Sequence, residues 1–265
     1  MKTEKRIIVG TTLLLLALGG CSAAKTETAK PTTNNVAVSE EKSTTDSTEK
    51  KKVEATVVLN TEGVVTIKEP ERINALVNKH NKFPDGYTPT DLVHPDVPFV
   101  FGEQVVERSM LRQEAATHLE TMFAAAKKQA IHLSGVSAFR SYDTQVSIFD
   151  GYVQQDGKEK ALTYSALPGT SEHQSGLAID ISNAAGEFAA EQGFETTAEG
   201  KWLAKESYKY GYILRFPEGK DAITGYEYES WHFRYIGQSL AKKVFDSGLT
   251  YEEYAMKYPD GIVKY

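Results

Sequence analysis

The chain has 265 residues, with 30 Lys and Arg against 36 Asp and Glu, which gives a formal net charge of −6. Hydrophobic residues make up 40% of the sequence, which suits one packed domain and excludes a polytopic membrane protein or a fully disordered chain. The acidic balance disfavours nucleic acid as the main partner, because proteins that bind phosphate backbones usually present a basic face.

The N-terminus has the parts of an export signal. Basic residues precede an apolar stretch, residues 7–18, that is shorter than the roughly 20 residues of a membrane-spanning helix. Residues 18–21, Leu-Gly-Gly-Cys, resemble a bacterial lipobox, in which the cysteine is lipidated and becomes the mature N-terminus. We therefore expect a signal peptide over 1–20 and a lipid anchor on Cys21 at the extracellular face of a bacterial membrane. The alternative is an ordinary cleaved signal with an incidental cysteine.

The next segments differ sharply in composition. Residues 22–52 contain no aromatic residue, Leu or Ile, so they cannot bury enough apolar surface to offset chain entropy. We predict a disordered tether over 21–52. The Val-rich residues 53–68 are typical of two short strands in a hairpin around 60–63, and we assign no role to this β segment, 53–70. We expect one domain over 71–265.

Within that domain, helical and strand patterns follow one another in no strict alternation, which indicates an α+β fold. The predicted strands cover 132–139, 177–181, 212–216 and 231–236. The predicted helices cover 108–130, 143–153 with Asp143 as N-cap, 199–210 ending at Gly211, 238–247, and a last helix opened by the capping box of Thr250 and Glu253.

Four residues suggest a metal-dependent hydrolase. His173 lies in a loop rich in Gly and Ser, and Asp180 lies inside an apolar strand, where a carboxylate is costly to bury unless it is paired or binds a cation. Glu229 and His232 stand three residues apart at the start of another apolar strand. Each alone is compatible with a structural role. Together, two His and one Asp form a three-ligand zinc set with an open position, and the extra Glu supplies a base.

These motifs give a family resemblance. Ser171-x-His173-x6-Asp180 followed by Glu229-x-x-His232 resembles the zinc D-Ala-D-Ala and L,D-carboxypeptidase family, the relatives of VanY and VanX. The similarity covers about residues 75–235 and includes Leu76-Val77-Asn78-Lys79, Asp91-Leu92-Val93, Phe139-Arg140-Ser141-Tyr142 with Gln145, Pro168-Gly169 and Leu214-Arg215-Phe216-Pro217.

The resemblance implies a fold and a set of roles. The fold would be that of the Hedgehog and D-Ala-D-Ala-peptidase type, a central antiparallel sheet flanked by helices. One Zn²⁺ would be bound by His173, Asp180 and His232, with Glu229 as catalytic base and Arg140 over the substrate. The other four histidines have no matching partners, and we interpret them as structural or exposed (His80, His94, His118 and His132).

The expected reaction is removal of the C-terminal D-alanine from peptidoglycan stem peptides, with a preference for the L,D bond of tetrapeptides. Such an enzyme must hold a free carboxylate, and the candidates are Arg140, Ser141, Gln145 and Ser171. Small departures, Ala138 and Phe139 in the arginine motif, leave the finer substrate preference open. The alternatives are a D,D-carboxypeptidase on pentapeptides, a cell-wall endopeptidase, and a peptidoglycan-binding module with a vestigial zinc site. We expect a monomer.

Overall fold

The computed structural model describes residues 63–259. These residues belong to one compact unit of the chain. The predicted signal peptide, Cys21 and the tether lie outside the described residues. Within the described part, none of the helices combines the length and apolar character needed to cross a membrane.

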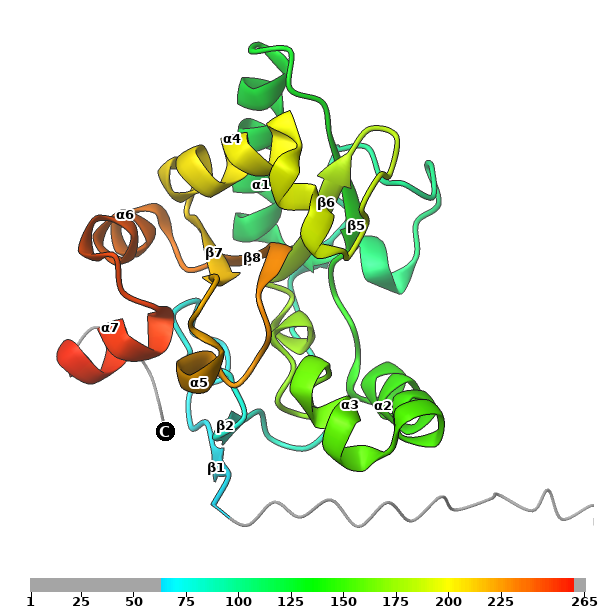
Figure 1. Cartoon of the computed structure of the whole chain (residues 1–265), viewed down its shortest axis with the longest axis vertical. Helices are drawn as coiled ribbons and strands as arrows, with labels where there is room; N and C mark the ends of the chain where they lie inside the picture. The colour runs from blue at the N-terminus through cyan, green and yellow to red at the C-terminus, as the bar shows by residue number, and fades with distance from the viewer. Residues whose placement is uncertain (1–62, 260–265) are drawn as a thin grey trace, which may run out of the picture. The chain divides into compact units, whose positions relative to one another are not determined.

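The sheet at the centre of the domain has four strands in the order β5-β6-β8-β7, and every neighbouring pair is antiparallel (Figure 1). Its strands are β5 (Leu133–Ser137), β6 (Ala178–Asn183), β7 (Tyr212–Phe216) and β8 (Glu229–Tyr235). This arrangement confirms the predicted α+β fold with a central antiparallel sheet.

Helices and short strands complete the domain. The helices are α1 (Gln113–Lys127), α2 (Tyr142–Asp156), α3 (Lys158–Tyr164), α4 (Ala198–Glu206), α5 (Asp221–Thr224), α6 (Gln238–Ser247) and α7 (Tyr251–Lys257). Two small pairs lie outside the main sheet, parallel β1 (Val65–Thr66) with β2 (Asn81–Lys82), and antiparallel β3 (Leu92–Val93) with β4 (Leu111–Arg112). In Figure 1, α6 and α7 lie beyond the edge strand β7, and α2 and α3 lie together on the other side of the domain.

The two faces of the sheet have opposite chemical character. Side chains alternate between faces along a strand, and in β6 Ile179 and Ile181 join the main hydrophobic core while Asp180 does not. In β8 the same alternation sends Phe233 and Tyr235 into the core and leaves His232 and Arg234, both buried, for the opposite face. The sheet therefore has an apolar face and a buried polar face.

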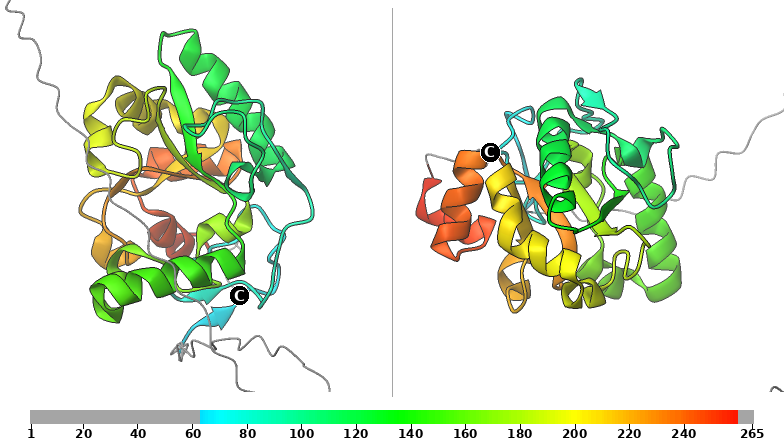
Figure 2. Two further views of the ribbon diagram at one scale, coloured as in Figure 1. Left: turned by 90° about the vertical axis from the view of Figure 1, so that its right-hand side faces the viewer. Right: turned by 90° about the horizontal axis from the view of Figure 1, so that it is seen from above.

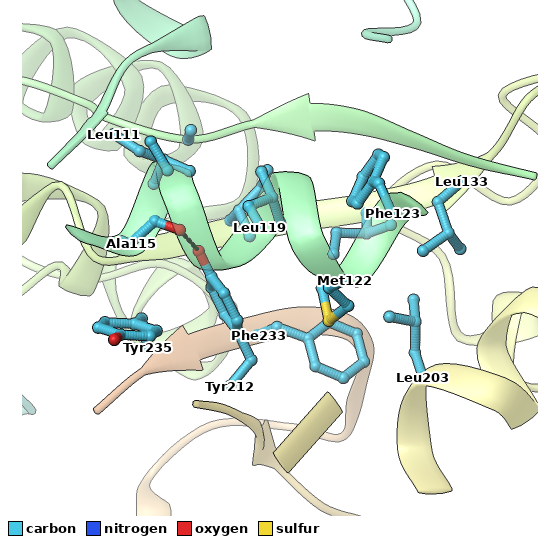
Figure 3. Close-up of a cluster of buried hydrophobic side chains, with 14 of the residues drawn as sticks. Leu111, Ala115, Leu119, Met122, Phe123, Leu133, Leu203, Tyr212, Phe233 and Tyr235 are labelled. Carbon is cyan, nitrogen blue, oxygen red and sulfur yellow. Dashed lines mark hydrogen bonds between the residues drawn. The ribbon is translucent and has the colours of Figure 1, made fainter. Parts of the chain in front are cut away.

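Helices α1 and α4 cover the apolar face (Figures 2 and 3). The helical stripe of α1 supplies Leu119 and Met122, which are fully buried against side chains of the sheet. The hydroxyl of Tyr212 donates a hydrogen bond of 2.7 Å to the carbonyl of Ala115, drawn as a dashed line in Figure 3, so this buried phenol is satisfied. The hydrophobic core thus packs against one face of the sheet, and the polar side chains lie on the opposite face.

Replacing Leu119→Ala should lower the free energy of unfolding by about 2–5 kcal/mol, because a fully buried leucine is lost and the sheet can close the cavity only in part. Urea unfolding followed by circular dichroism measures this change. Thr117→Ala, on the exposed side of the same helix, should stay within about 0.5 kcal/mol of the parent. Equal effects of the two substitutions would contradict the assignment of Leu119 to the core.

Several predicted elements are confirmed. The strand 212–216 and the helix 238–247 have the predicted bounds, and the capping box of Thr250 and Glu253 opens α7. The residues 199–210 form α4 followed by a 3-10 turn that ends at Gly211, as predicted, in the left-handed conformation. These elements are specified by neighbouring residues, so the sequence pattern suffices to find them.

Other boundaries were wrong for identifiable reasons. The helix expected from residue 108 begins at Gln113, because Leu111 and Arg112 pair with β3 instead. The N-cap of α2 is Ser141, whose hydroxyl accepts a hydrogen bond from the amide of Thr144, and not Asp143. The sequence reasoning also missed α3 and the short α5.

The described part of the Val-rich segment packs within the domain. Ile67 is buried with Ala75, Val77 and Phe83 in a small hydrophobic cluster. Val65 and Thr66 pair in parallel with residues 81–82, and the first strand of the predicted hairpin lies outside the described residues. The partner that the structure gives β1 is therefore distant in sequence and could not be found from a hairpin pattern.

Candidate active site

Two of the candidate ligands meet because of strand register. β6 and β8 pair so that Asp180 lies directly opposite His232 on the buried polar face. Facing residues on neighbouring antiparallel strands are the closest side-chain pairs in a sheet, and here the Oδ1 of Asp180 lies 3.1 Å from the Nδ1 of His232. Residues that are 52 positions apart in sequence thus form one side-chain pair.

His173 reaches the same point from a 3-10 turn, Glu172–Ser175, that precedes β6. Its Nδ1 lies 2.6 Å from the carbonyl of Ala138, and its Nε2 lies 3.4 Å from the Oδ2 of Asp180. The turn ends at Gly176 in the left-handed conformation, where a Cβ atom would lie only 2.7 Å from a methyl group of Leu92. Gly176 therefore allows the tight connection between His173 and the strand that carries Asp180.

The three residues fit a divalent metal ion. His173, Asp180 and His232 each offer a ligand atom, these atoms lie within 4.8 Å of one another, and all three residues are buried. The two imidazole rings are almost perpendicular, with centroids 5.0 Å apart. Two imidazole nitrogens and one carboxylate oxygen are a donor set that catalytic zinc sites use, and three protein ligands leave a coordination position open.

The electrostatics at these ligands favour a cation. Burial lowers the pKa of His173 to about 3, so its imidazole is neutral, the form that binds metals. Burial also opposes a charge on His232, but its hydrogen bonds to Asp180 and Glu172 outweigh burial and raise the pKa to about 10. The carboxylates around His232 thus stabilise positive charge at this point, and a metal ion would compete there with a proton.

Glu229, at the start of β8, lies beside the candidate ligands. Its Oε2 is 3.6 Å from the Nδ1 of His232, and its side chain is 15% exposed. Burial raises its pKa to about 7, against the opposing effect of His232. A carboxyl group with a pKa near neutrality can accept a proton and return it, which is what a general base must do.

The site opens into a cavity of about 360 Å³. Its lining includes Arg140, Ser171 and the four residues described above. An aromatic wall comes from α2, α3, the segment before β8 and β8 itself (Tyr152, Tyr164, Tyr226, Tyr228 and Trp231). An aromatic wall that faces convergent polar groups is typical of a substrate pocket.

The predicted substrate-contacting residues differ in their placement. Arg140 and Ser171 line the cavity, whereas Ser141 and Gln145 do not. Ser141 caps α2 and donates a hydrogen bond to Glu107. Gln145 is buried and accepts a hydrogen bond of 3.0 Å from Arg140. Ser141 and Gln145 therefore lie behind the cavity wall. Ser141 caps the start of α2, and Gln145 orients the guanidinium group of Arg140.

The sequence reasoning missed a buried ionic group beside the site. Glu172 bonds to Arg215 and Arg234, and its other carboxylate oxygen lies 3.3 Å from the Nε2 of His232. Burial alone would raise the pKa of Glu172, but the two guanidinium groups outweigh burial and hold that pKa well below its usual range. Arg215 and Arg234 lie inside apolar strands, so the criterion that identified Asp180 could also have identified them.

Fold and site together define a mixed helix and sheet protein in which three buried side chains could hold a divalent metal ion beside a carboxyl group. Hydrolases that activate water with a metal ion use such an arrangement. Comparison with known proteins gives the family. The profile of the VanY family, D-alanyl-D-alanine carboxypeptidase, matches residues 108–238. The chain is 50% identical over 200 residues to the Bacillus subtilis protein named "Putative carboxypeptidase YodJ", covering 76% of this chain and 73% of that protein. The chain belongs to the VanY carboxypeptidase family.

Solved structures agree in fold. The structure of the LdcB LD-carboxypeptidase is 48% identical and superposes with a TM-score of 0.71, over 77% of this chain and 93% of that one. A VanY D,D-pentapeptidase mutant from the VanB-type resistance cassette, in complex with Zn(II), is 31% identical with a TM-score of 0.56, over 69% of this chain and 98% of that one. The expected family resemblance and the Hedgehog-like peptidase fold are thereby confirmed.

Proposed function

We propose that the protein is a zinc-dependent carboxypeptidase that removes the C-terminal D-alanine from peptidoglycan stem peptides. The observation that carries the proposal is the convergence of His173, Asp180 and His232 within 4.8 Å, with Glu229 beside them in a cavity. Family membership supports the reaction class, and the zinc complex of the VanY relative supports the metal.

In the proposed mechanism, His173, Asp180 and His232 would hold the zinc ion. When bound, zinc would act as a Lewis acid that polarises the scissile carbonyl and makes water more acidic. The carboxylate of Glu229 accepts the proton of the attacking water and then transfers it to the departing amine. Arg140, oriented by Gln145 and lying in the cavity wall, binds either the terminal carboxylate or the oxygen on which negative charge develops.

We further propose a preference for the L,D bond of tetrapeptides. The support is the comparison of relatives: identity and TM-score are higher for the LD-carboxypeptidase LdcB, 48% and 0.71, than for the VanY D,D-pentapeptidase, 31% and 0.56. This preference would depend on the cavity residues that contact the penultimate residue of the peptide. A pocket rejects a peptide that leaves its buried polar groups without hydrogen-bond partners.

Defined muropeptides test the proposal. The full chain is incubated with tetrapeptide and pentapeptide substrates, with and without a chelator, and products are identified by mass spectrometry. We expect loss of one alanine from the tetrapeptide, abolished by the chelator and restored by Zn²⁺. Faster trimming of the pentapeptide would favour the D,D-carboxypeptidase, cleavage of cross-linked dimers would favour the endopeptidase, and binding without any cleavage would leave only a peptidoglycan-binding module.

We also propose that Cys21 carries a lipid anchor that holds the enzyme at the outer face of the membrane. The support is the lipobox-like sequence at 18–21 after a basic and apolar start. In a bacterial host that processes lipoproteins, Cys21→Ser should release the protein or leave the precursor unprocessed, as seen by fractionation and mass spectrometry. Ser22→Ala should keep the membrane location. Normal size and normal membrane retention of Cys21→Ser would contradict the anchor.

A further inference from the structure

Next to the proposed metal site lies a buried group of ionic side chains to which the proposed reaction gives no role. The side chains of Arg215 and Arg234 are fully buried, and that of Glu172 is 3% exposed. Charges at this depth cost free energy unless each is paired and hydrogen-bonded. The free-energy cost of burying these three charges indicates that they have a specific role, and the contacts of Glu172 indicate which one.

The two oxygens of Glu172 have different partners. Oε1 accepts hydrogen bonds from the Nε of Arg215 at 2.8 Å and from the Nη1 of Arg234 at 2.9 Å. Oε2 is aimed at the imidazole of His232, 3.3 Å from its Nε2. The two arginines thus fix the carboxylate, and the fixed carboxylate presents one free acceptor to a candidate metal ligand.

The contact between Glu172 and His232 determines which ring nitrogen of His232 can bind a metal ion. An ionised carboxylate only accepts hydrogen bonds, so the Nε2 that faces it must carry the proton. The Nδ1 of His232 faces the candidate ligand Asp180, at 3.1 Å, and the proposed base Glu229, at 3.6 Å, and its lone pair is then available for a metal ion. His173 is arranged the opposite way, since its Nδ1 faces the carbonyl of Ala138 and its Nε2 faces Asp180.

We propose that Glu172 is a positioning residue for the metal site: its carboxylate, fixed by Arg215 and Arg234, accepts a hydrogen bond from His232 and keeps the Nδ1 of that imidazole as the ligating atom. This role rests on the proposed zinc site. Outer partners of ligating histidines set the tautomer and the ring orientation, and their loss usually weakens metal binding about 10–100-fold.

The network also connects the metal site with segments outside the family match at 108–238. Arg215 bonds through both of its terminal nitrogens to Glu252 of α7. Arg234 donates to the backbone carbonyls of Ile73 and Ala75. These contacts therefore tie the C-terminal helix and the segment near residue 75 to the central sheet.

The test is the substitution Glu172→Gln in the full chain. The amide has one oxygen and one NH₂ group, so it cannot accept from both arginines and from His232 at once. If its NH₂ group faces His232, the proton of the imidazole moves to Nδ1 and blocks ligation. We expect zinc affinity, measured by competition with a chromogenic chelator, to fall about 10–100-fold. In the cobalt-substituted protein, the visible absorption bands should shift.

Glu252→Gln is the matched control, because it makes the same chemical change on the same Arg215 without touching His232. It should lower Tm while leaving zinc affinity and the cobalt spectrum as in the parent. Parent-like zinc affinity in Glu172→Gln, or equal losses of affinity in both variants, would overturn the positioning role. A parent chain that binds no zinc would overturn the proposed function as well.

A measurement on the unsubstituted protein decides the question even if Glu172→Gln fails to fold. Two-bond ¹H–¹⁵N correlation spectra of the zinc-loaded chain, labelled at its six histidines, report which ring nitrogen carries a proton. We expect a protonated Nε2 on His232 and a protonated Nδ1 on His173. A protonated Nδ1 or an unprotonated Nε2 on His232 would overturn the role of Glu172.

Discussion

Glu229→Gln should lower kcat for release of D-alanine by about 10²–10⁴-fold, because a positioned general base contributes about that factor and an amide cannot accept the proton. The substitution keeps the size of the side chain and leaves the three proposed ligands unchanged, so zinc content should stay at the parent level. Steady-state kinetics on the preferred muropeptide and elemental analysis measure the two quantities.

Glu227→Gln is the matched control for this prediction. Glu227 also lines the cavity, two residues before Glu229, but it is exposed. Its replacement removes one negative charge near the site without removing the proposed base, so kcat should remain close to that of the parent. A parent-like rate in Glu229→Gln, or equal losses in both variants, would show that the base lies elsewhere.

His173→Ala should abolish both metal binding and hydrolysis. The remaining ligands, Asp180 and His232, would hold the ion with two side chains where catalytic zinc sites use three. Since loss of a mere outer partner costs about 10–100-fold in affinity, loss of a direct ligand should exceed that range. Zinc content after dialysis, determined by elemental analysis, checks this expectation.

His132→Ala serves as the comparison, since His132 is exposed, immediately precedes β5 and lies outside the cavity lining. It should retain zinc and activity. If His173→Ala kept a full equivalent of zinc, His173 would not be a ligand, and the proposed mechanism would lose its metal site. If both variants lost the metal, the effect would come from general loss of folded protein, which Tm measurements would reveal.

Much of the candidate site could be read from the sequence. A carboxylate between two isoleucines, as at Asp180, signals a buried charge that needs a partner, and the spacing of Glu229 and His232 on a strand signals a second cluster. The helix 238–247 and the capping box of Thr250 agree with the structure. These features depend on residue type and on neighbours in sequence.

The supporting residues could not be assigned in the same way. Gln145 looked like a substrate contact, but its side chain is buried and accepts a hydrogen bond from Arg140. Ser141 looked similar, yet its hydroxyl caps α2. Whether a polar side chain points into a cavity or supports a neighbour depends on backbone placement within a few ångströms, and residue type alone carries no such information.

By itself, the sequence determined the candidate groups: two imidazoles, a carboxylate inside an apolar strand and a second carboxyl group nearby, in a chain with an export-like start. Only the tertiary structure decided the register that places Asp180 opposite His232, and the ionic group of Glu172, Arg215 and Arg234 behind them. The physical reason is the distance along the sequence over which each effect acts. Side-chain type and local pattern act over a few residues, whereas strand pairing and burial join segments that lie tens of residues apart.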